Sequence, residues 1–202
     1  MIIETIPLEI FSKEEGFHAK INIKVDGHLT TVLLDTGAPS SRVKSDSFIS
    51  KYPSMGVKEP KGASGVGHNV EIFSPDIIFL GGQKVTGISL ERGEDEGVLG
   101  LDILKNFIFQ YDLESSAIHI LDKTPGRTEE MRILKTGHLT VPLKVGEESI
   151  FGLFDTGSDA TVFDEKFISE NKDSFKLVRN ELGTDHHGNK IESKIYNCSN
   201  MT

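Results

Sequence analysis

Two aspartates, Asp35 and Asp155, occupy closely similar positions at widely separated points of the chain. Each begins the triplet Asp-Thr-Gly at the end of an apolar run, in "LLDTGAPSS" (33–41) and again in "LFDTGSDAT" (153–161). Two carboxylates that are held close together cannot both ionise easily, so one keeps a proton while the other accepts one. Such a pair can deprotonate a water molecule and protonate a leaving group, without a metal ion or a covalent intermediate.

The two triplets belong to a longer internal repeat. A shift of 120 positions places "HAKINIKVDGHLTTVLLDTGAPSSRV" over "HLTVPLKVGEESIFGLFDTGSDATVF", and His18 then aligns with His138. With one further residue of shift, Gly67 aligns with Gly188. These flanking matches make coincidence a poor explanation for the two triplets. A chain with one aspartate per repeat can form the pair if the repeats are related by an approximate two-fold axis.

The elements that must position the two aspartates are predicted to be strands. Residues 21–25 alternate apolar and polar side chains with a period of two, which is typical of a half-buried strand. Asp26-Gly27 favours a tight hairpin turn, because glycine tolerates a positive φ angle, and the second strand then leads into Asp35. The expected fold class is therefore all-β, meaning mainly β with short helices.

Several further elements are expected along the first repeat. A short helix is predicted over Lys44–Ser50, and a hairpin over "DIIFLGGQKVTGISL" (76–90). Glu91–Glu96 is interpreted as a solvated acidic loop. The remaining predictions are an apolar strand and a short helix from Leu101 to about Asn106 in "GVLGLDILKNF", and two strands joined at Glu114–Ser116 in "FIFQYDLESSAIHIL".

The composition and charge exclude several classes of partner. The 202 residues are 37% hydrophobic and 26% charged, as in an ordinary globular protein. A formal net charge of -9 argues against a nucleic-acid partner or an anionic membrane, because binding to phosphates needs a basic patch. No apolar run reaches transmembrane length. No signal peptide is visible, so the expected compartment is cytoplasmic by default, or periplasmic or secreted if the N-terminus was trimmed.

Cysteine and histidine usage gives no sign of a metal or a disulfide framework. Cys198 is the single cysteine, and no Cys and His spacing typical of a zinc site occurs. His186 and His187 are adjacent, and adjacent side chains on a strand point to opposite faces, so a shared metal is not expected. We therefore expect no cofactor and no metal.

At the two triplets the sequence resembles the aspartic proteases of the pepsin and retropepsin clan. The resemblance rests on Asp35-Thr36-Gly37-Ala38, on Ser41 six residues after the aspartate, and on the apolar-apolar-glycine sequence Val98-Leu99-Gly100 before a short helix. It covers about residues 17–121 for one retropepsin-like lobe and about 137–202 for most of another. Residues 62–69 lack the tyrosine of the pepsin flap, which favours a retropepsin-like or bacterial variant.

The resemblance implies two lobes related by pseudo-two-fold symmetry. The first retropepsin-like lobe is expected at 1–124, a linker at 125–136 and a second, incomplete lobe at 137–202. Thr202 corresponds to about Gly81 or Gly82 of the first repeat, so a second copy of "GVLGLDIL" is missing from the sequence given. We therefore interpret the second repeat as truncated.

The implied activity is that of an aspartic endopeptidase acting on a polypeptide substrate. Asp35 and Asp155 are implied to share a proton and to activate the water that attacks the peptide carbonyl. Thr36 and Thr156 look like the threonines whose hydroxyls join the two lobes beneath this dyad.

The remaining candidate residues have supporting or substrate-binding roles in the resembled family. Support of the active-site loops is implied for Gly37 and Gly157, which allow close backbone approach, and for Ser41 and Thr161. The stretches "GASGVGHN" and "GTDHHGNK" look like flap tips that cover a bound peptide. Their candidate substrate-binding residues are Gly65, Val66, Gly67, His68, His186, His187 and Gly188.

Two alternatives remain open at this stage. In the first, the protein is a homodimeric retropepsin-like protease that pairs Asp35 of one copy with Asp35 of another, and the second repeat is an appendage. In the second, the protein is a peptide-binding or assembly module that keeps a protease-like fold without catalysis. An incomplete second lobe makes this credible because it can expose a sheet edge that pairs with a partner.

Overall fold

The computed structural model describes residues 1–13, 16–60, 67–126, 131–158, 160–184, 190–199 and 201. Of these residues, 52% are in strands and 9% are helical, which confirms the expectation of a mainly β protein. Within the described part of the chain, every helix is too short or too polar to cross a membrane.

The chain forms two compact units, and each unit is made of three separate segments of the sequence. The first unit contains residues 1–57, 71–141 and 153–160, and the second contains 58–70, 142–152 and 161–202. The Asp-Thr-Gly loop of the second repeat therefore belongs to the same unit as the loop of the first repeat.

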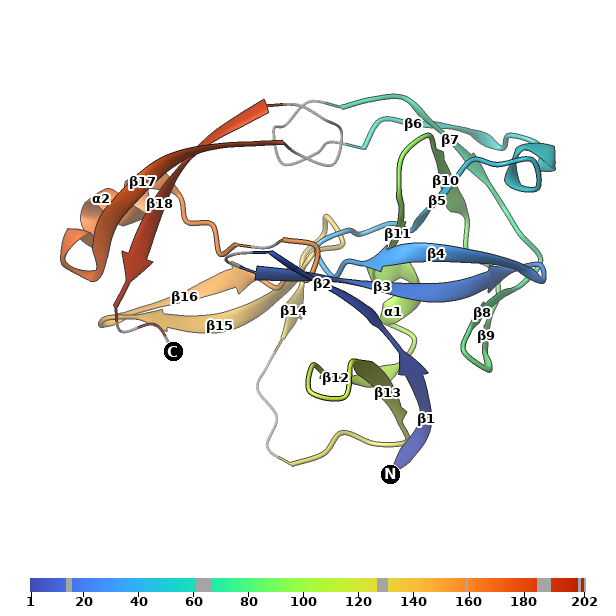
Figure 1. The fold of residues 1–202 in the computed structure, drawn as a ribbon, viewed down its shortest axis with the longest axis horizontal. Coiled ribbons are helices and arrows are strands. Elements are labelled where there is room, and N and C mark those ends of the chain that lie inside the picture. The colour runs from blue at the N-terminus through green and yellow to red at the C-terminus, as the bar shows by residue number, and fades with distance from the viewer. Residues whose placement is uncertain are drawn as a thin grey trace. The chain divides into compact units, whose positions relative to one another are not determined.

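The largest sheet has ten strands (Figure 1). Their order is β6-β7-β10-β5-β11-β4-β3-β8-β9, and β2 pairs with β3. The bounds are β2 (Glu9–Lys13), β3 (Gly16–Val25), β4 (His28–Leu34), β5 (Arg42–Lys44), β6 (Gly56–Lys58), β7 (Val70–Phe73), β8 (Ile78–Leu80), β9 (Gln83–Val85), β10 (Leu90–Gly93) and β11 (Gly97–Leu99).

Within the described residues, eight further strands form three smaller sheets, and two short helices and two 3₁₀ turns complete the fold. A three-stranded sheet has the order β1-β13-β12, another has the order β14-β15-β16, and β17 pairs with β18. The strand bounds are β1 (Ile2–Pro7), β12 (Ile108–Asp112), β13 (Ala117–Leu121), β14 (Arg132–Ile133), β15 (Leu139–Val145), β16 (Glu148–Leu153), β17 (Phe175–Thr184) and β18 (Lys190–Cys198). The helices are α1 (Leu101–Leu104) and α2 (Glu165–Glu170), with 3₁₀ turns η1 (Ile49–Lys51) and η2 (Lys172–Ser174).

The hairpin of β3 and β4 follows directly from the local sequence. Ile21, Ile23 and Val25 alternate along β3 and are all buried, while the residues between them face away from the core. The turn between the strands has positive φ at both central residues, 46° at Asp26 and 84° at Gly27, as the favoured two-residue hairpin turn requires. The predicted strand, turn and second strand are therefore confirmed.

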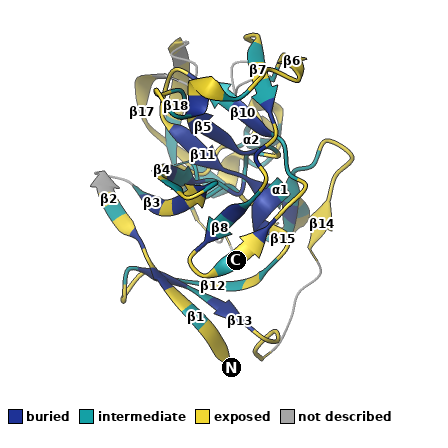
Figure 2. Cartoon of the chain, turned by 90° about the vertical axis from the view of Figure 1, so that its right-hand side faces the viewer, coloured by how far each residue is buried: buried dark blue, intermediate teal, exposed yellow. Residues whose placement is uncertain are grey.

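The core of the first unit lies beneath the strands that lead to Asp35. β11 pairs in parallel with β4, so that Leu99 lies beside Leu34, and both side chains are fully buried. Helix α1 starts directly after β11, as predicted, and ends two residues before the expected Asn106. The buried positions follow the inner faces of these elements (Figure 2). Among the largest fully buried side chains are Phe73, Ile49, Ile78, Leu80, Leu90, Ile103, Leu104 and Ile118.

Two strands close the first repeat, as the sequence predicts. β12 and β13 are antiparallel, with Asp112 beside Ala117, and a turn over 113–116 joins them. The N-terminal strand β1 pairs with β13 on its other side. Of the hairpin predicted over 76–90, β8 and β9 form around Gly81, but β9 ends at Val85 and Leu90 already belongs to β10.

The helix predicted over Lys44–Ser50 is wrong. Lys44 ends strand β5, which pairs with β10 on one side and β11 on the other. The chain then makes only the short turn η1, and Oδ1 of Asp46 accepts from the backbone N–H of its first residue, Ile49, at 2.8 Å. Tyr52 is already extended, at φ −68° and ψ 137°, because the following residue is Pro53 and the residue before a proline avoids helical angles.

The acidic loop predicted over Glu91–Glu96 is correct only for its second half. Residues 91–93 belong to β10, which lies between β7 and β5, and Glu91 is only 6% exposed. Residues 94–96 are exposed in the connection to β11. The charge of Glu91 suggested solvent, but pairing on both sides of β10 places this residue inside the sheet.

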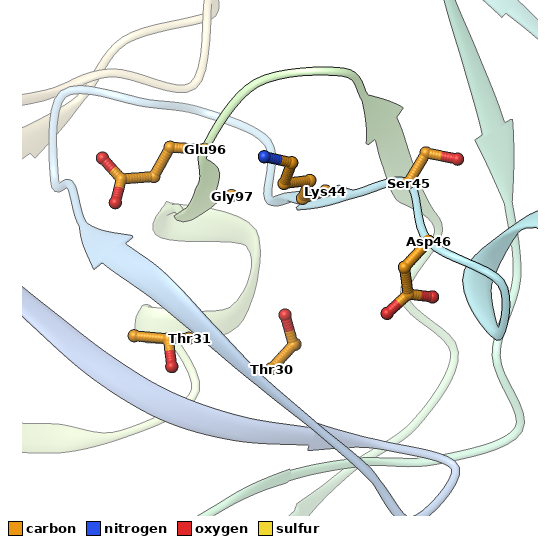
Figure 3. A pocket seen from close by; sticks show the side chains of 7 residues that line it. All are labelled: Thr30, Thr31, Lys44, Ser45, Asp46, Glu96 and Gly97. Atoms are coloured by element: carbon orange, nitrogen blue, oxygen red, sulfur yellow. The ribbon is translucent and has the colours of Figure 1, made fainter.

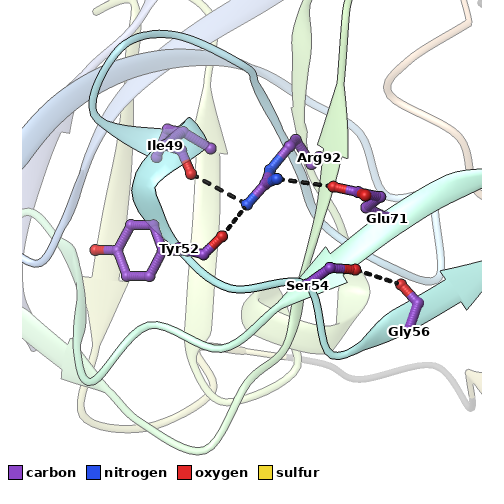
Figure 4. A network of polar contacts seen from close by, with 6 residues as sticks. All are labelled: Ile49, Tyr52, Ser54, Gly56, Glu71 and Arg92. Carbon is purple, nitrogen blue, oxygen red and sulfur yellow. Dashed lines mark hydrogen bonds and ion pairs between the residues drawn. The ribbon is translucent and has the colours of Figure 1, made fainter.

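A single arginine fixes the turn that replaces the predicted helix (Figure 4). Nη2 of Arg92 donates to the carbonyl oxygens of Tyr52 at 2.6 Å and Ile49 at 3.2 Å. Nη1 donates to Oε2 of Glu71 at 2.7 Å. The guanidinium lies 5.6 Å from the ring centre of Phe73, within the range of a cation–π contact. Arg92 thus ties β10 to η1 and to β7.

The described residues of the second unit form a small aromatic cluster rather than a large core. Phe163 packs against Phe167 and Phe175 with ring-centre distances of 5.6 and 5.1 Å, and Phe175 lies 6.2 Å from Tyr196. The cluster joins α2 to the β17–β18 hairpin. Asp164 caps α2 by accepting from the backbone N–H of Lys166 at 2.9 Å.

We expect Arg92→Met to lower the free energy of unfolding by about 1–3 kcal/mol, because the carbonyl oxygens of Tyr52 and Ile49 lose a charged donor in a largely buried setting. Urea unfolding followed by circular dichroism measures this change. Lys166→Met is the matched control: Lys166 is 81% exposed and faces Glu170 across 3.8 Å, so its loss should cost less than about 0.5 kcal/mol. Equal effects of the two variants would contradict the role given to Arg92.

Candidate active site

Asp35 lies where the paired strands β4 and β11 end. Its backbone N–H donates to the carbonyl oxygen of Leu99 at 3.1 Å, which continues the pairing of β4 with β11 by one residue. The chain then turns sharply, and Oδ1 of Asp35 accepts from the backbone N–H groups of Gly37 at 2.8 Å and Ala38 at 2.9 Å. The buried strands fix the position of the residue, and the turn fixes the plane of its carboxyl group.

The two Asp-Thr-Gly loops are joined by reciprocal hydrogen bonds of their threonines. Oγ1 of Thr36 donates to the carbonyl oxygen of Phe154 at 2.7 Å and accepts from the backbone N–H of Thr156 at 3.0 Å. Oγ1 of Thr156 donates to the carbonyl oxygen of Leu34 at 2.9 Å and accepts from the backbone N–H of Thr36 at 3.1 Å. Each hydroxyl thus bridges two backbone groups of the other loop, and Thr36 is fully buried.

The glycine of each triplet lies against the carboxyl group of the other triplet. A Cβ atom added to Gly37 would lie 2.3 Å from Cγ of Asp155, and one added to Gly157 would lie 2.4 Å from Cγ of Asp35. Real Cβ atoms do not approach other atoms so closely, so a side chain at either position would displace the opposite carboxyl group. The two glycines are required because they let the carboxyl groups approach.

The pair changes the acidity of Asp35. Burial raises the pKa of Asp35 to about 7, and both the negative charge of Asp155 and a side-chain hydrogen bond with Asp155 act in the same direction. The N–H groups of Ala38 and Gly37 oppose this rise by stabilising the ionised form. On the other side, Oδ1 of Asp155 accepts from the backbone N–H of Gly157 at 2.9 Å. A carboxyl that keeps its proton near neutral pH, next to a second carboxyl, can act as an acid beside a base.

Ser41 is buried beneath the first loop, and its partner is a residue that the sequence analysis missed. Oγ of Ser41 donates to Oδ1 of Asp102 at 2.5 Å. Asp102 stands two residues after the glycine of Val98-Leu99-Gly100. It is a charged residue in the first turn of an otherwise apolar helix, and this feature of the sequence could have singled it out. Thr161, the matching residue of the second repeat, is exposed and belongs to the second unit.

Most of the predicted flap residues lie outside the described residues, namely Gly65, Val66, His186, His187 and Gly188. Gly67 and His68 are described and belong to the second unit. A Cβ atom added to Gly67 would lie 2.8 Å from Cγ of Glu59, and His68 is exposed. A role for these residues in substrate binding stays a prediction.

A polar pocket lies beside the middle of β4 (Figure 3). It measures about 310 Å³, and it starts four residues before Asp35 along the strand, at Thr31. With a rise of about 3.3 Å per residue, this places the pocket more than about 10 Å from the carboxyl pair. Three hydroxyl and three charged side chains surround it together with a glycine: Thr30, Thr31, Ser45, Lys44, Asp46, Glu96 and Gly97. None of the predicted site residues lines this pocket.

No protein-family model matches the sequence, and no curated protein matches it at a significant level. The function is therefore inferred from the residues of the chain and their geometry.

We expect the threonine bonds to stabilise the fold as well as the site. Thr36→Val keeps the shape of the side chain but leaves the Thr156 N–H and the Phe154 carbonyl without their partner, so the free energy of unfolding should fall by about 1–3 kcal/mol. Thr36→Ser keeps the hydroxyl and should lose about 0.8 kcal/mol or less, the value of one buried methyl group. Urea unfolding measures both, and equal losses in the two variants would show that the hydroxyl contributes nothing.

The raised pKa of Asp35 links folding stability to pH. Its folded-state pKa of about 7 lies above the ordinary value of 3.8, so between these two pH values the native protein binds more protons here than the unfolded chain does. The contribution of Asp35 to stability is therefore complete below pH 3.8 and is lost as the pH rises through about 7.

We expect Asp35→Asn to remove this pH dependence, because an amide imitates the protonated carboxyl and does not ionise. The variant should gain stability relative to the wild type as the pH rises from about 4 to about 8. Urea unfolding at a series of pH values tests this, with the exposed Asp95→Asn as the control that follows the wild type. A constant difference between Asp35→Asn and the wild type across this range would show that Asp35 titrates normally.

Proposed function

We propose that this protein is an aspartic endopeptidase that hydrolyses peptide bonds through a water activated by Asp35 and Asp155. The observation that carries the proposal is the contact of the two carboxyl groups across reciprocally bonded Asp-Thr-Gly loops, with the pKa of Asp35 raised to about 7. Two carboxyl groups in such contact are stable when they share one proton, and this is the state that acid–base catalysis needs.

In the proposed mechanism, Asp35 is the acid and Asp155 is the base. Asp155 removes a proton from the bound water while the water oxygen attacks the peptide carbonyl carbon, and Asp35 gives its proton to the carbonyl oxygen. The proton now on Asp155 then passes to the amide nitrogen, and the C–N bond breaks. A hydroxyl of the tetrahedral intermediate returns its proton to Asp35, which restores the starting state with one acid and one amine as products.

The resemblance to the pepsin and retropepsin clan supports a polypeptide as substrate. Both Asp-Thr-Gly triplets and the apolar-apolar-glycine sequence at 98–100 match that clan. The reciprocal bonds of Thr36 and Thr156 are those expected if the two repeats form lobes around an approximate two-fold axis, which we include in the proposal. A bound substrate would then lie as an extended chain across the carboxyl pair.

The contact of Asp35 with Asp155 favours a dyad within one chain over one made by two copies of Asp35. It also counts against a purely binding role, since binding an extended peptide does not require two carboxyl groups in contact. Both alternatives are separated from the proposal by the variants below.

We expect Asp35→Asn and Asp155→Asn each to lower kcat of peptide cleavage by about 10²–10⁴-fold with little change in KM, because each removes one partner of the proton transfer. Activity should fall as the pH rises through about 7, where Asp35 loses its proton. A library of unstructured peptides with mass-spectrometric detection measures this, with Asp95→Asn as the control.

Each alternative gives a different result in this experiment. Full activity of Asp155→Asn together with loss of activity in Asp35→Asn would indicate a homodimeric dyad. Peptide binding without cleavage at any pH would indicate a binding module. Undiminished cleavage by both variants would exclude the dyad as the catalyst.

A further inference from the structure

The loop that carries Asp35 rests on a second carboxyl group, that of Asp102. Oδ2 of Asp102 accepts from the backbone N–H of Ser41 at 2.9 Å, and Oδ1 accepts from the Ser41 hydroxyl at 2.5 Å. Oγ of Ser41 in turn accepts from the backbone N–H of Gly100 at 2.9 Å. Ser41 is only 1% exposed, so these bonds form where water does not compete.

The backbone on the N-terminal side of Asp102 also contacts the loop that carries Asp35. Leu99 accepts from the N–H of Asp35 at 3.1 Å, and the N–H of Leu101 donates to Ala38 at 2.9 Å. A Cβ atom added to Gly100 would lie 2.7 Å from the carbonyl oxygen of Ala38, so the two segments touch. Together with the Asp102–Ser41 bonds, these contacts hold both ends of the loop between Asp35 and Ser41.

We propose that Asp102 is a positioning residue for Asp35, acting through Ser41 on the loop that carries the Asp35 carboxyl group. This inference rests on the proposed function, because it concerns the geometry of the same carboxyl pair. Asp102 touches neither carboxyl of the dyad in this role. It sets the conformation of the turn whose N–H groups orient Asp35.

A carboxylate suits this position better than any other group. It offers two oxygens, one for the N–H and one for the hydroxyl of Ser41, and charged acceptors form stronger hydrogen bonds than neutral ones. Because the Ser41 hydroxyl donates to Asp102, its lone pair is directed to the N–H of Gly100. An asparagine would keep one acceptor but would place its NH₂ group against a second donor.

The test compares Asp102→Ala, Asp102→Asn, Ser41→Ala and Ser41→Thr in the full chain. Threonine stands at the matching position of the second repeat, Thr161, so Ser41→Thr is the conservative variant that keeps the hydroxyl. Asp95→Asn is the matched control, an exposed aspartate outside the site. For each variant, kcat, KM and the pH profile are measured at a temperature at which circular dichroism shows the native spectrum.

We expect Asp102→Ala and Ser41→Ala each to lower kcat by about 10–100-fold while KM changes by less than about threefold, since small misplacements of a catalytic group cost this much. The double variant of Asp102→Ala and Ser41→Ala should lower kcat no more than either single variant, because both substitutions remove the same hydrogen bond between Ser41 and Asp102. Ser41→Thr should keep kcat within about threefold of the wild type. The upper limb of the pH profile should move to lower pH in Asp102→Ala, because a freer Asp35 can separate from Asp155.

Several outcomes would overturn the proposal. If Asp102→Ala keeps the wild-type kcat and pH profile while Asp35→Asn is inactive, the positioning role is wrong and the dyad stands. If Asp35→Asn is itself fully active, the proposed function fails first. If Asp102→Ala does not fold, Asp102→Asn and the two Ser41 variants provide the test. Equal kcat in Ser41→Ala and Ser41→Thr, together with an unchanged pH profile in Asp102→Asn, would contradict the positioning role of Asp102.

Discussion

The hydrogen bonds between Thr36 and Thr156 are the interaction on which the rest of the site depends. Two carboxyl groups in contact repel when both ionise and lose hydration when buried, so they do not approach without an external constraint. The threonine hydroxyls supply it, since each binds a carbonyl and an N–H of the opposite loop. Gly37 and Gly157 then leave the space into which the opposite carboxyl fits.

Strand β11 and the residues that follow it connect the core of the first unit to the Asp35 loop. β11 is paired with β4 on one side and β5 on the other, and its last residue, Leu99, is fully buried. The chain passes directly from this strand into Gly100 and helix α1, which contribute the contacts beneath the Asp35 loop. Packing of an apolar core thereby fixes the orientation of a carboxyl group at the end of these strands.

The sequence predicted the features that depend on neighbouring residues. The period-two pattern of β3 and the Asp26-Gly27 turn are local, and the structure has both. The helix expected over Lys44–Ser50 failed because strand pairing and Pro53, which act from outside that window, leave room for one turn only. The burial of Glu91 could not be foreseen, because it depends on two strands that are distant in the sequence.

In the candidate site too, the sequence indicated some residues, and others depend on contacts between distant segments. The internal repeat singled out Asp35 and Asp155, because a repeated triplet can be recognised without knowing the fold. Asp102 was missed, since it occurs once and its partner Ser41 is 61 residues away. The pairing of β11 with β4 and with β5, which starts directly after Ser41, brings these two residues together, and no local pattern encodes that pairing.

The central claim is that Asp35 and Asp155 share one proton. Carbon-13 NMR titration of the aspartate side-chain carboxyl groups, in the wild type and in Asp155→Asn, tests it most directly. We predict that Asp35 titrates with a midpoint near 7 in the wild type and that this midpoint falls once the charge of Asp155 is removed. A midpoint of Asp35 near 3.8, unchanged by the substitution, would contradict the account.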